Sequence, residues 1–261
     1  MAIRIKNKSE IETMRRSGKA ASILLQRLGE AIRPGISTFE LDQISRKLIK
    51  ELGGIPSFLG YRPPNHPPYP ATICSSINEE IVHGIPSKDR VLNEGDIIGI
   101  DVAVIIDSYH GDNAFTFPVG RISPEAQKLI DVTKTSLYRA IGAVKPGNRI
   151  GDVGFAVQSY VEERGLSVIR ELCGHGIGQK LWEEPQVPNY GVPGRGIRLK
   201  PGMVIAIEPM VSAGTHEVKF LDDGWTSITA DHSLSAHFEH TIAILSDGPE
   251  ILTHNKALWG E

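Results

Sequence analysis

The first apolar positions of the chain recur every three or four residues, which is the spacing of an amphipathic helix. The side chains of this stripe are Ile11, Met14, Ala21, Leu25, Leu28 and Ile32. Ser9 followed by Glu12 predicts the start of the helix, because these residue types form a capping box. Ser37 with Glu40 has the same pattern, and Ser123 followed by a proline predicts a third helix start.

Two apolar runs, Ile97–Ile106 and Tyr109–Pro118, are typical of a β-hairpin that turns near Asp107. If the turn is centred between residues 106 and 107, Asp101 and Asp112 face each other directly, with Cβ atoms roughly 5 Å apart. Two facing carboxylates repel each other unless a cation lies between them. No basic residue occupies a neighbouring inward position, so the hairpin predicts a metal site.

Three pairs of similar segments follow one another in the same order along the chain. They are Ala31–Gly35 with Ala143–Gly147, His83–Ile85 with His175–Ile177, and Leu92–Asp101 with Leu199–Glu208. Chance similarity of Pro-Gly turns would explain one pair, but three ordered pairs favour two related halves. We expect a single domain over residues 1–261, with halves of roughly 10–122 and 123–252 joined about a pseudo-twofold axis.

The repeat adds further ligand-type side chains to the two aspartates of the hairpin. Glu208 occupies the repeat position of Asp101, and Glu239 ends another segment with an apolar pattern. His175 stands between glycines, which let the backbone approach an ion closely. Any one of these residues alone is more often structural, and only their joint placement predicts a metal site. Four carboxylates and one imidazole suit Mn²⁺, Fe²⁺, Co²⁺ or Zn²⁺.

The other histidines predict no second site. His237 and His240 have the spacing of a zinc pair, but a strand would place them on opposite faces, with His237 on the face of Glu239. The histidines that belong to no group of ligands are His66, His110, His216, His232 and His254.

Composition restricts the class of protein. The 261 residues carry a net charge of −3 with both signs mixed, which gives no electrostatic signature of nucleic-acid or membrane binding. No apolar run is long enough for a signal peptide or a membrane span. Two cysteines, Cys74 and Cys173, make no disulfide framework, so a reducing cytoplasm is expected.

The motifs around the candidate ligands resemble those of the methionine aminopeptidases. The matching segments are Gly-Ile-Asp101 with Asp112 eleven residues later, Gly-His175-Gly-Ile-Gly, Ile-Glu208-Pro-Met and Phe-Glu239-His. The resemblance extends from about Ile11 to Leu252 and implies the α/β pita-bread fold, a central curved antiparallel sheet flanked by helices. The chain lacks zinc-finger cysteines, a long N-terminal extension and a large insert before Glu239, which resembles the short type I, bacterial-like form.

The resemblance implies a role for each ligand. Asp101 would bind one metal ion, Asp112 and Glu239 would bridge two ions, and His175 and Glu208 would bind the second ion. A hydroxide shared by the metals would attack the carbonyl group after the first residue of the substrate, with Glu208 as the proton shuttle. The implied reaction removes the initiator methionine from nascent chains that have a small second residue.

The resemblance also implies a substrate pocket. His83 would contact the scissile amide. The side chains implied to surround the methionine are Tyr69, Cys74 and Trp225. Asn78 and Ser235 would contribute to a monovalent cation site. The expected partners are nascent polypeptide N-termini, with transient ribosome association and a monomeric enzyme.

This sequence departs from the family pattern at Trp182, where the family usually carries a histidine that steadies the substrate carbonyl. Asn113 stands where threonine is more frequent, and the loop Arg62–Pro68 beside the pocket is longer than usual. We therefore expect a substrate contact from Trp182 together with a slower rate or a shifted preference. The alternatives are a Xaa-Pro peptidase of the same fold, which usually has an additional N-terminal domain, and a non-enzymatic binding protein, which typically loses metal ligands.

Overall fold

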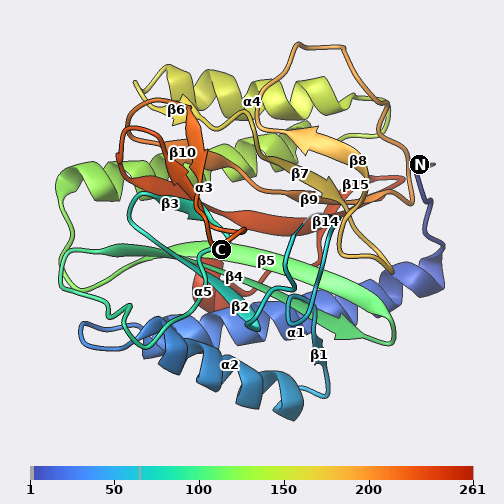
Figure 1. The fold of residues 1–261 in the computed structure, drawn as a ribbon. Helices are drawn as coiled ribbons and strands as arrows, with labels where there is room; N and C mark the ends of the chain where they lie inside the picture. Colours follow the sequence, from blue (N-terminus) through green and yellow to red (C-terminus); the bar gives the residue numbers. More distant parts are fainter. Residues whose placement is uncertain (1–2, 65, 261) are drawn as a thin grey trace.

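The computed structural model describes residues 3–64 and 66–260, which are built around a curved antiparallel sheet of nine strands (Figure 1). Neighbouring strands follow the order β1-β4-β5-β14-β9-β7-β8, while β15 pairs with β14 and β2 pairs with β4. The strands of this sheet are β1 (Ile55–Pro56), β2 (Ile73–Ile77), β4 (Ile97–Ile106), β5 (Tyr109–Pro118), β7 (Cys173–Gly176), β8 (Glu183–Pro188), β9 (Val204–Ile207), β14 (Glu239–Leu245) and β15 (Gly248–Ile251).

Two three-stranded sheets accompany the large one. The first contains β6 (Ser167–Val168), β10 (Met210–Ser212) and β13 (Ser235–His237). The second contains β3 (Glu80–Val82), β11 (Val218–Phe220) and β12 (Ser227–Thr229). The loop Arg62–Pro68 precedes β2 in the chain, and its residue 65 falls outside the described residues.

The helices cover the large sheet from two sides. They are α1 (Lys8–Ala31), α2 (Thr38–Glu51), α3 (Pro124–Ala143), α4 (Ile150–Glu162) and the short α5 (Lys256–Trp259). Helices α1 and α2 lie against β4, β5 and β2 at the bottom of Figure 1, whereas α3 and α4 pack together at the top, near β9, β14 and β8. Within the described residues, no helix has the length and apolar character needed to span a membrane.

Helix α1 begins earlier than expected, so the prediction of a cap at Ser9 was wrong. The side chain of Asn7 accepts a hydrogen bond from the backbone N–H of Glu10 at 3.0 Å, and the carboxylate of Glu10 accepts one from the N–H of Asn7 at 2.7 Å. The backbone N–H of Lys6 donates to the carbonyl of Gly202 at 2.7 Å, which holds the preceding segment against a loop of the second half. The helix therefore begins at Lys8, with Asn7 as its N-cap.

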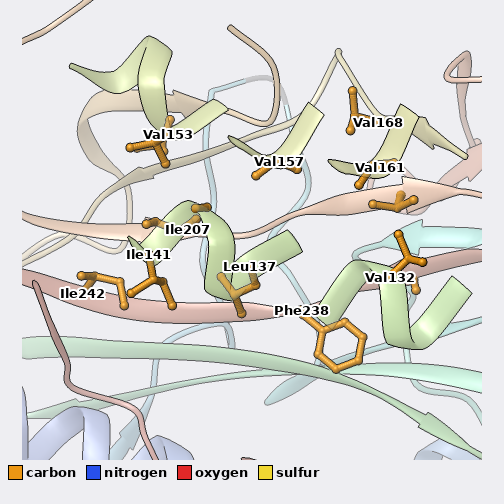
Figure 2. Close-up of a cluster of buried hydrophobic side chains, with 14 of the residues drawn as sticks. Val132, Leu137, Ile141, Val153, Val157, Val161, Val168, Ile207, Phe238 and Ile242 are labelled. Atoms are coloured by element: carbon orange, nitrogen blue, oxygen red, sulfur yellow. The ribbon is translucent and has the colours of Figure 1, made fainter. Parts of the chain in front are cut away.

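The later helix starts are confirmed. Ser37 and Glu40 form a complete capping box at α2, and the side chain of Ser123 caps α3 with a proline in the first turn. Their apolar faces enter two cores. One core joins α1 to β4 through buried leucines and isoleucines, and the other joins α3 and α4 to β9 and β14. Figure 2 shows Ile141 of α3 beside Ile242 of β14, with Leu137 one turn away along the same helix.

The hairpin of β4 and β5 has the predicted strand bounds but a different register. Ile106 pairs with Tyr109, so residues 107 and 108 form a two-residue turn, with φ of 45° and 69°. Asp101 therefore lies opposite Ala114, and Asp112 lies opposite Ala103. The prediction that the two aspartates face each other directly was wrong by two residues. Because side chains alternate between faces with a period of two, both aspartates still share one face as diagonal neighbours.

Backbone contacts support the prediction of two related halves. In the first half, the N–H of Gly35 donates to the carbonyl of Leu92 at 2.8 Å. At the matching repeat positions, the N–H of Gly147 donates to the carbonyl of Leu199 at 3.1 Å. Both glycines have positive φ, 87° and 96°, which a residue with a side chain rarely adopts. In each half, the turn before the second helix is thus hydrogen-bonded to the segment that leads into a strand of the large sheet. These strands are β4 in the first half and β9 in the second.

Candidate metal centre and active site

All five predicted ligands line one cavity of about 420 Å³. Asp101 comes from β4, Asp112 from β5, and Glu239 from the start of β14. Glu208 follows β9 directly, and His175 lies on β7. Because these strands are neighbours in the order β4-β5-β14-β9-β7, five adjacent strands deliver one ligand-type side chain each. Residues up to 138 positions apart in sequence therefore converge through sheet pairing alone.

The distances between the side chains suit a metal site. His175 Nε2 lies 3.6 Å from Glu208 Oε1 and 3.9 Å from Asp112 Oδ2. Asp112, His175 and Glu239 each offer a ligand atom, and these atoms lie within 4.8 Å of one another. His175 Nδ1 lies 2.8 Å from the carbonyl oxygen of Gly176, so a proton on Nδ1 leaves the lone pair of Nε2 directed into the cavity.

Electrostatics give an independent argument that these residues fit divalent metal ions. Burial raises the pKa of Asp101 and of Glu239 well above the ordinary carboxyl value, and neighbouring carboxylates add to the effect. Burial raises the pKa of Asp112 to about 7. In the described part of the chain, no salt bridge joins these carboxylates to lysine or arginine, and the atoms Asp101 Oδ1, Asp112 Oδ1 and Glu239 Oε1 are buried without a hydrogen-bond partner. Buried carboxylates in this state are costly until a cation compensates them.

The two positions beside His175 have no room for a side chain, which explains why both are glycines. A Cβ atom on Gly174 would lie 2.4 Å from the carbonyl oxygen of Ala206. A Cβ atom on Gly176 would lie 2.1 Å from the carbonyl oxygen of Glu184. Strand β7 thus lies in close backbone contact with β9 and β8, which the glycines on both sides of His175 permit.

His83 also lines the cavity, in an unusual conformation. It follows β3 directly and has φ of 61°, in the left-handed region. A residue with a side chain pays on the order of 1–3 kcal/mol for such a conformation. Burial lowers the pKa of His83 to about 4, with His66 and His175 as further causes, so its imidazole is neutral near pH 7.

The residues expected to surround the methionine lie behind the cavity wall. Tyr69, Cys74 and Trp225 are buried together in one apolar cluster but are not among the residues that line the cavity. The Tyr69 and Trp225 rings lie 5.1 Å apart, and the indole N–H of Trp225 donates to the carbonyl of Pro67 at 3.0 Å. Besides Trp182, the apolar side chains that line the cavity include Phe58, Val82, Leu172 and Met210, which the sequence did not single out.

Trp182 stands at the mouth of the cavity and is 37% exposed. Its ring centroid lies 6.1 Å from that of His83 and 6.2 Å from that of His175. The ring of Tyr61 packs against it in an edge-on contact, with the centroids 5.1 Å apart. The indole therefore lies in the wall of the cavity beside two histidines, and its contact with substrate stays a prediction.

His237 is a residue that the sequence did not assign to the site. Its Nε2 lies 3.6 Å from Glu208 Oε2 and has no hydrogen-bond partner. Burial lowers the pKa of His237 to about 3, with His83 as a second cause. The shared face of His237 and Glu239 was the available signal. His240 lies elsewhere, against Trp259 and Thr253, as the strand alternation predicts.

The expected monovalent cation site rests on two residues that are in contact. The backbone N–H of Ser235 donates to the carbonyl of Asn78 at 2.8 Å. The side chain of Asn78 bonds to Asp96 and to the N–H of Ile97, and its φ is 54°. These contacts bring β13 beside the turn after β2, and the cation site stays a prediction.

Comparison with known proteins gives the family. The model of metallopeptidase family M24 matches residues 12–246. The chain is 52% identical to a methionine aminopeptidase of Clostridium acetobutylicum over 95% of this chain and 98% of the relative. It is 51% identical to methionine aminopeptidase 1 of Bacillus subtilis, again over 95% and 98% of the two chains.

A solved structure agrees with these relatives and with the expected pita-bread fold. The crystal structure of methionine aminopeptidase from Thermotoga maritima is similar with a TM-score of 0.94 at 44% identity, covering 97% of this chain and all of the other. The family, the full-length coverage and the fold agree with the convergence of ligand-type side chains in one cavity. The chain belongs to metallopeptidase family M24 and, within it, to the methionine aminopeptidases.

Proposed function

We propose that this chain uses divalent metal ions to remove the N-terminal methionine from nascent proteins and peptides, and that it favours a small second residue. One observation carries the proposal: five neighbouring strands each deliver one ligand-type side chain to a single buried cavity. Sequence identity of about half to methionine aminopeptidases, over nearly the full chain, supports the substrate.

The five side chains would hold two ions. Asp101 would bind one ion, and Asp112 and Glu239 would bridge the pair. His175 and Glu208 would bind the other ion. Co²⁺, Mn²⁺, Fe²⁺ and Zn²⁺ all suit these ligands, and when bound they supply Lewis acidity and lower the pKa of coordinated water.

The protein's own groups position the substrate and move the proton. Glu208 would take a proton from the attacking water and pass it to the leaving amine, because its carboxyl group lies in the cavity between His175 and His237. His83 is neutral near pH 7, so its ring can both donate and accept a hydrogen bond at the scissile amide. The methionine side chain would lie against Phe58 and Met210, with Tyr69, Cys74 and Trp225 behind that wall.

We also propose the setting in which the enzyme acts. It would be a cytoplasmic monomer that associates transiently with ribosomes, and a monovalent cation would bind near Asn78 and Ser235. The single domain over residues 1–261 would carry the whole activity. Light scattering after size exclusion tests the monomer, and co-sedimentation with ribosomes tests the association.

The test of the proposed activity is release of free methionine from Met-Ala-Ser and Met-Leu-Ser. The chelator-stripped protein would be assayed alone and with added Mn²⁺, Fe²⁺ or Co²⁺. We expect metal-dependent release from Met-Ala-Ser, with far slower release from Met-Leu-Ser. Asp112→Asn should abolish release, because it removes one charge from the bridging position. Asp107→Asn, the same change in the turn of the same hairpin, should leave release unchanged.

The same assay separates the alternatives. Release from a Xaa-Pro peptide in preference to Met-Ala-Ser would favour a Xaa-Pro peptidase. If the folded protein binds no stoichiometric metal and releases no methionine with any ion, the result would favour a non-enzymatic binding protein.

A further inference from the structure

His83 is the strained residue of the site, and its strain must be balanced by its surroundings. Its φ of 61° is disfavoured for any residue with a Cβ atom. Such a conformation persists only where neighbouring contacts determine the backbone on both sides. The contacts on the two sides of His83 therefore decide whether its ring faces the cavity.

The residue after His83 is fixed on β2. The carbonyl of Gly84 accepts hydrogen bonds from the N–H of Ser75 at 2.8 Å and from the hydroxyl of Tyr69 at 3.0 Å. The N–H of Gly84 donates to Ser76 Oγ at 3.2 Å. A Cβ atom on Gly84 would lie 2.3 Å from the carbonyl oxygen of Ser75, so the backbone is in direct contact with the strand.

One guanidinium group joins both sides of the strained residue to that strand. Arg90 donates to the carbonyl of Ile85 at 2.5 Å and to the carbonyl of Ser75 at 3.0 Å. It also forms an ion pair with Glu80. Glu80 lies three residues before His83, and Ile85 lies two residues after it. Arg90 thus ties the entry and the exit of the turn to β2 at once.

The ion pair is itself held in place. The carboxylate of Glu80 accepts a further hydrogen bond from the N–H of Ile77 at 2.8 Å. The side chains of Arg90 and Glu80 are 23% and 17% exposed, so water competes little with their contact. A guanidinium group can serve three acceptors in fixed directions, which an ammonium group on a flexible stem does less well.

We propose that Arg90, paired with Glu80, is a positioning residue for the aminopeptidase reaction: it keeps His83 in its left-handed conformation, with the ring facing the metal cavity. Arg90 is not among the residues that line the cavity, so its influence passes through His83. The inference rests on the proposed role of His83 in the reaction.

The test is a double-mutant cycle on the metal-loaded enzyme with Met-Ala-Ser as substrate. Arg90→Met should lower kcat on the order of tenfold or more, because a displacement of about 1 Å in a positioned group suffices for such a loss. KM should change by less than about threefold. In the His83→Ala background, Arg90→Met should lower kcat by less than about twofold, because the positioned ring is already absent.

Arg15→Met is the matched control. It removes an ion pair to Glu250 with two N···O distances of 2.7 Å and a further contact to Glu12, and none of these three residues lines the cavity. It should lower thermal stability and leave kcat unchanged. Metal content, measured in every variant, should not change.

Three results would overturn the inference. One is a kcat for Arg90→Met equal to that of Arg15→Met. Another is an equal loss of kcat with and without His83. The third is an unchanged kcat for His83→Ala, which removes the proposed role of His83 while leaving metal-dependent methionine release intact. If Arg90→Met does not fold, Arg90→Lys and Glu80→Gln are taken through the same cycle, and additive losses overturn the inference in the same way.

Discussion

At the scale of single residues, Trp182 lines the same cavity as the five ligand-type side chains, at a position where the resemblance to the family leads us to expect a histidine. Its indole lies beside His83 and His175 and packs against Tyr61. Indole has one N–H donor and no acceptor, whereas imidazole offers a donor and an acceptor. A wider ring at the mouth also restricts what can enter. We therefore expect Trp182 to affect the rate and the choice of second residue more than it affects metal binding.

Trp182→His should raise kcat/KM for Met-Ala peptides on the order of tenfold or more, because a donor to a developing negative charge is typically worth that much. The measurement is methionine release at saturating metal. Trp182→Phe serves as the control, since it keeps an aromatic contact with Tyr61 and removes the donor. An unchanged rate for Trp182→His would show that this position does not limit the reaction.

At the scale of elements, the start of α1 depends on a contact with the second half of the chain. Lys6 Nζ lies 2.8 Å from Glu183 Oε2 of β8, and the two side chains are 4% and 5% exposed. Burial acts to raise the pKa of Glu183, but the hydrogen bond and charge of Lys6, the backbone N–H of Lys180 and the charge of Arg4 together outweigh it and lower that pKa from its ordinary value of 4.5. The pair connects the segment before α1 to the wall of the cavity.

Lys6→Met should destabilise the protein by about 3 kcal/mol, because it leaves a buried carboxylate without its partner. The free energy of unfolding in urea measures this loss, and the same substitution in a Glu183→Gln background should cost clearly less. Because the pKa of Glu183 is lowered in the folded protein, the stability from this pair is present above pH 4.5 and is lost as the pH falls further. Equal costs in both backgrounds would contradict the role of the ion pair.

At the scale of the whole molecule, the order of strands in the large sheet brings four carboxyl groups into one buried cavity. Burial raises the pKa of the cavity carboxylates, so the metal-free fold is favoured when they are protonated. Stability from these groups is present at low pH and is lost as the pH rises through their raised pKa values. Metal ions bound by these carboxylates would replace those protons, so we expect metal binding and folding to be coupled.

Added Mn²⁺ should therefore raise Tm more at pH 7.5 than at pH 5.5, because at low pH protons compete for the same oxygens. Thermal unfolding of the chelator-stripped protein with and without Mn²⁺ measures the shift. Asp112→Asn should reduce the shift at pH 7.5. A shift that is the same at both values would show that the ions bind groups other than these carboxylates.

Much of this architecture could be predicted from local pattern. The bounds of β4 and β5 and the capping box of α2 follow from alternation and cap chemistry, which depend only on neighbouring residues. The register of the hairpin could not be fixed in the same way. The register depends on which two residues adopt positive φ in the turn. These are Asp107 and Ser108, and since neither is a glycine, the sequence does not mark the turn.

The sequence by itself determined the family, the type of fold and the set of ligand-type residues, because motif spacing and an internal repeat can be recognised from the order of residues along the chain. Only the tertiary structure decided which residues meet. It brought His237 to Glu208, placed Tyr69 and Trp225 behind the cavity wall, and joined Arg90 to both sides of His83. These contacts arise from strand order and from chain segments crossing one another, and neither leaves a periodic signal in the residues involved.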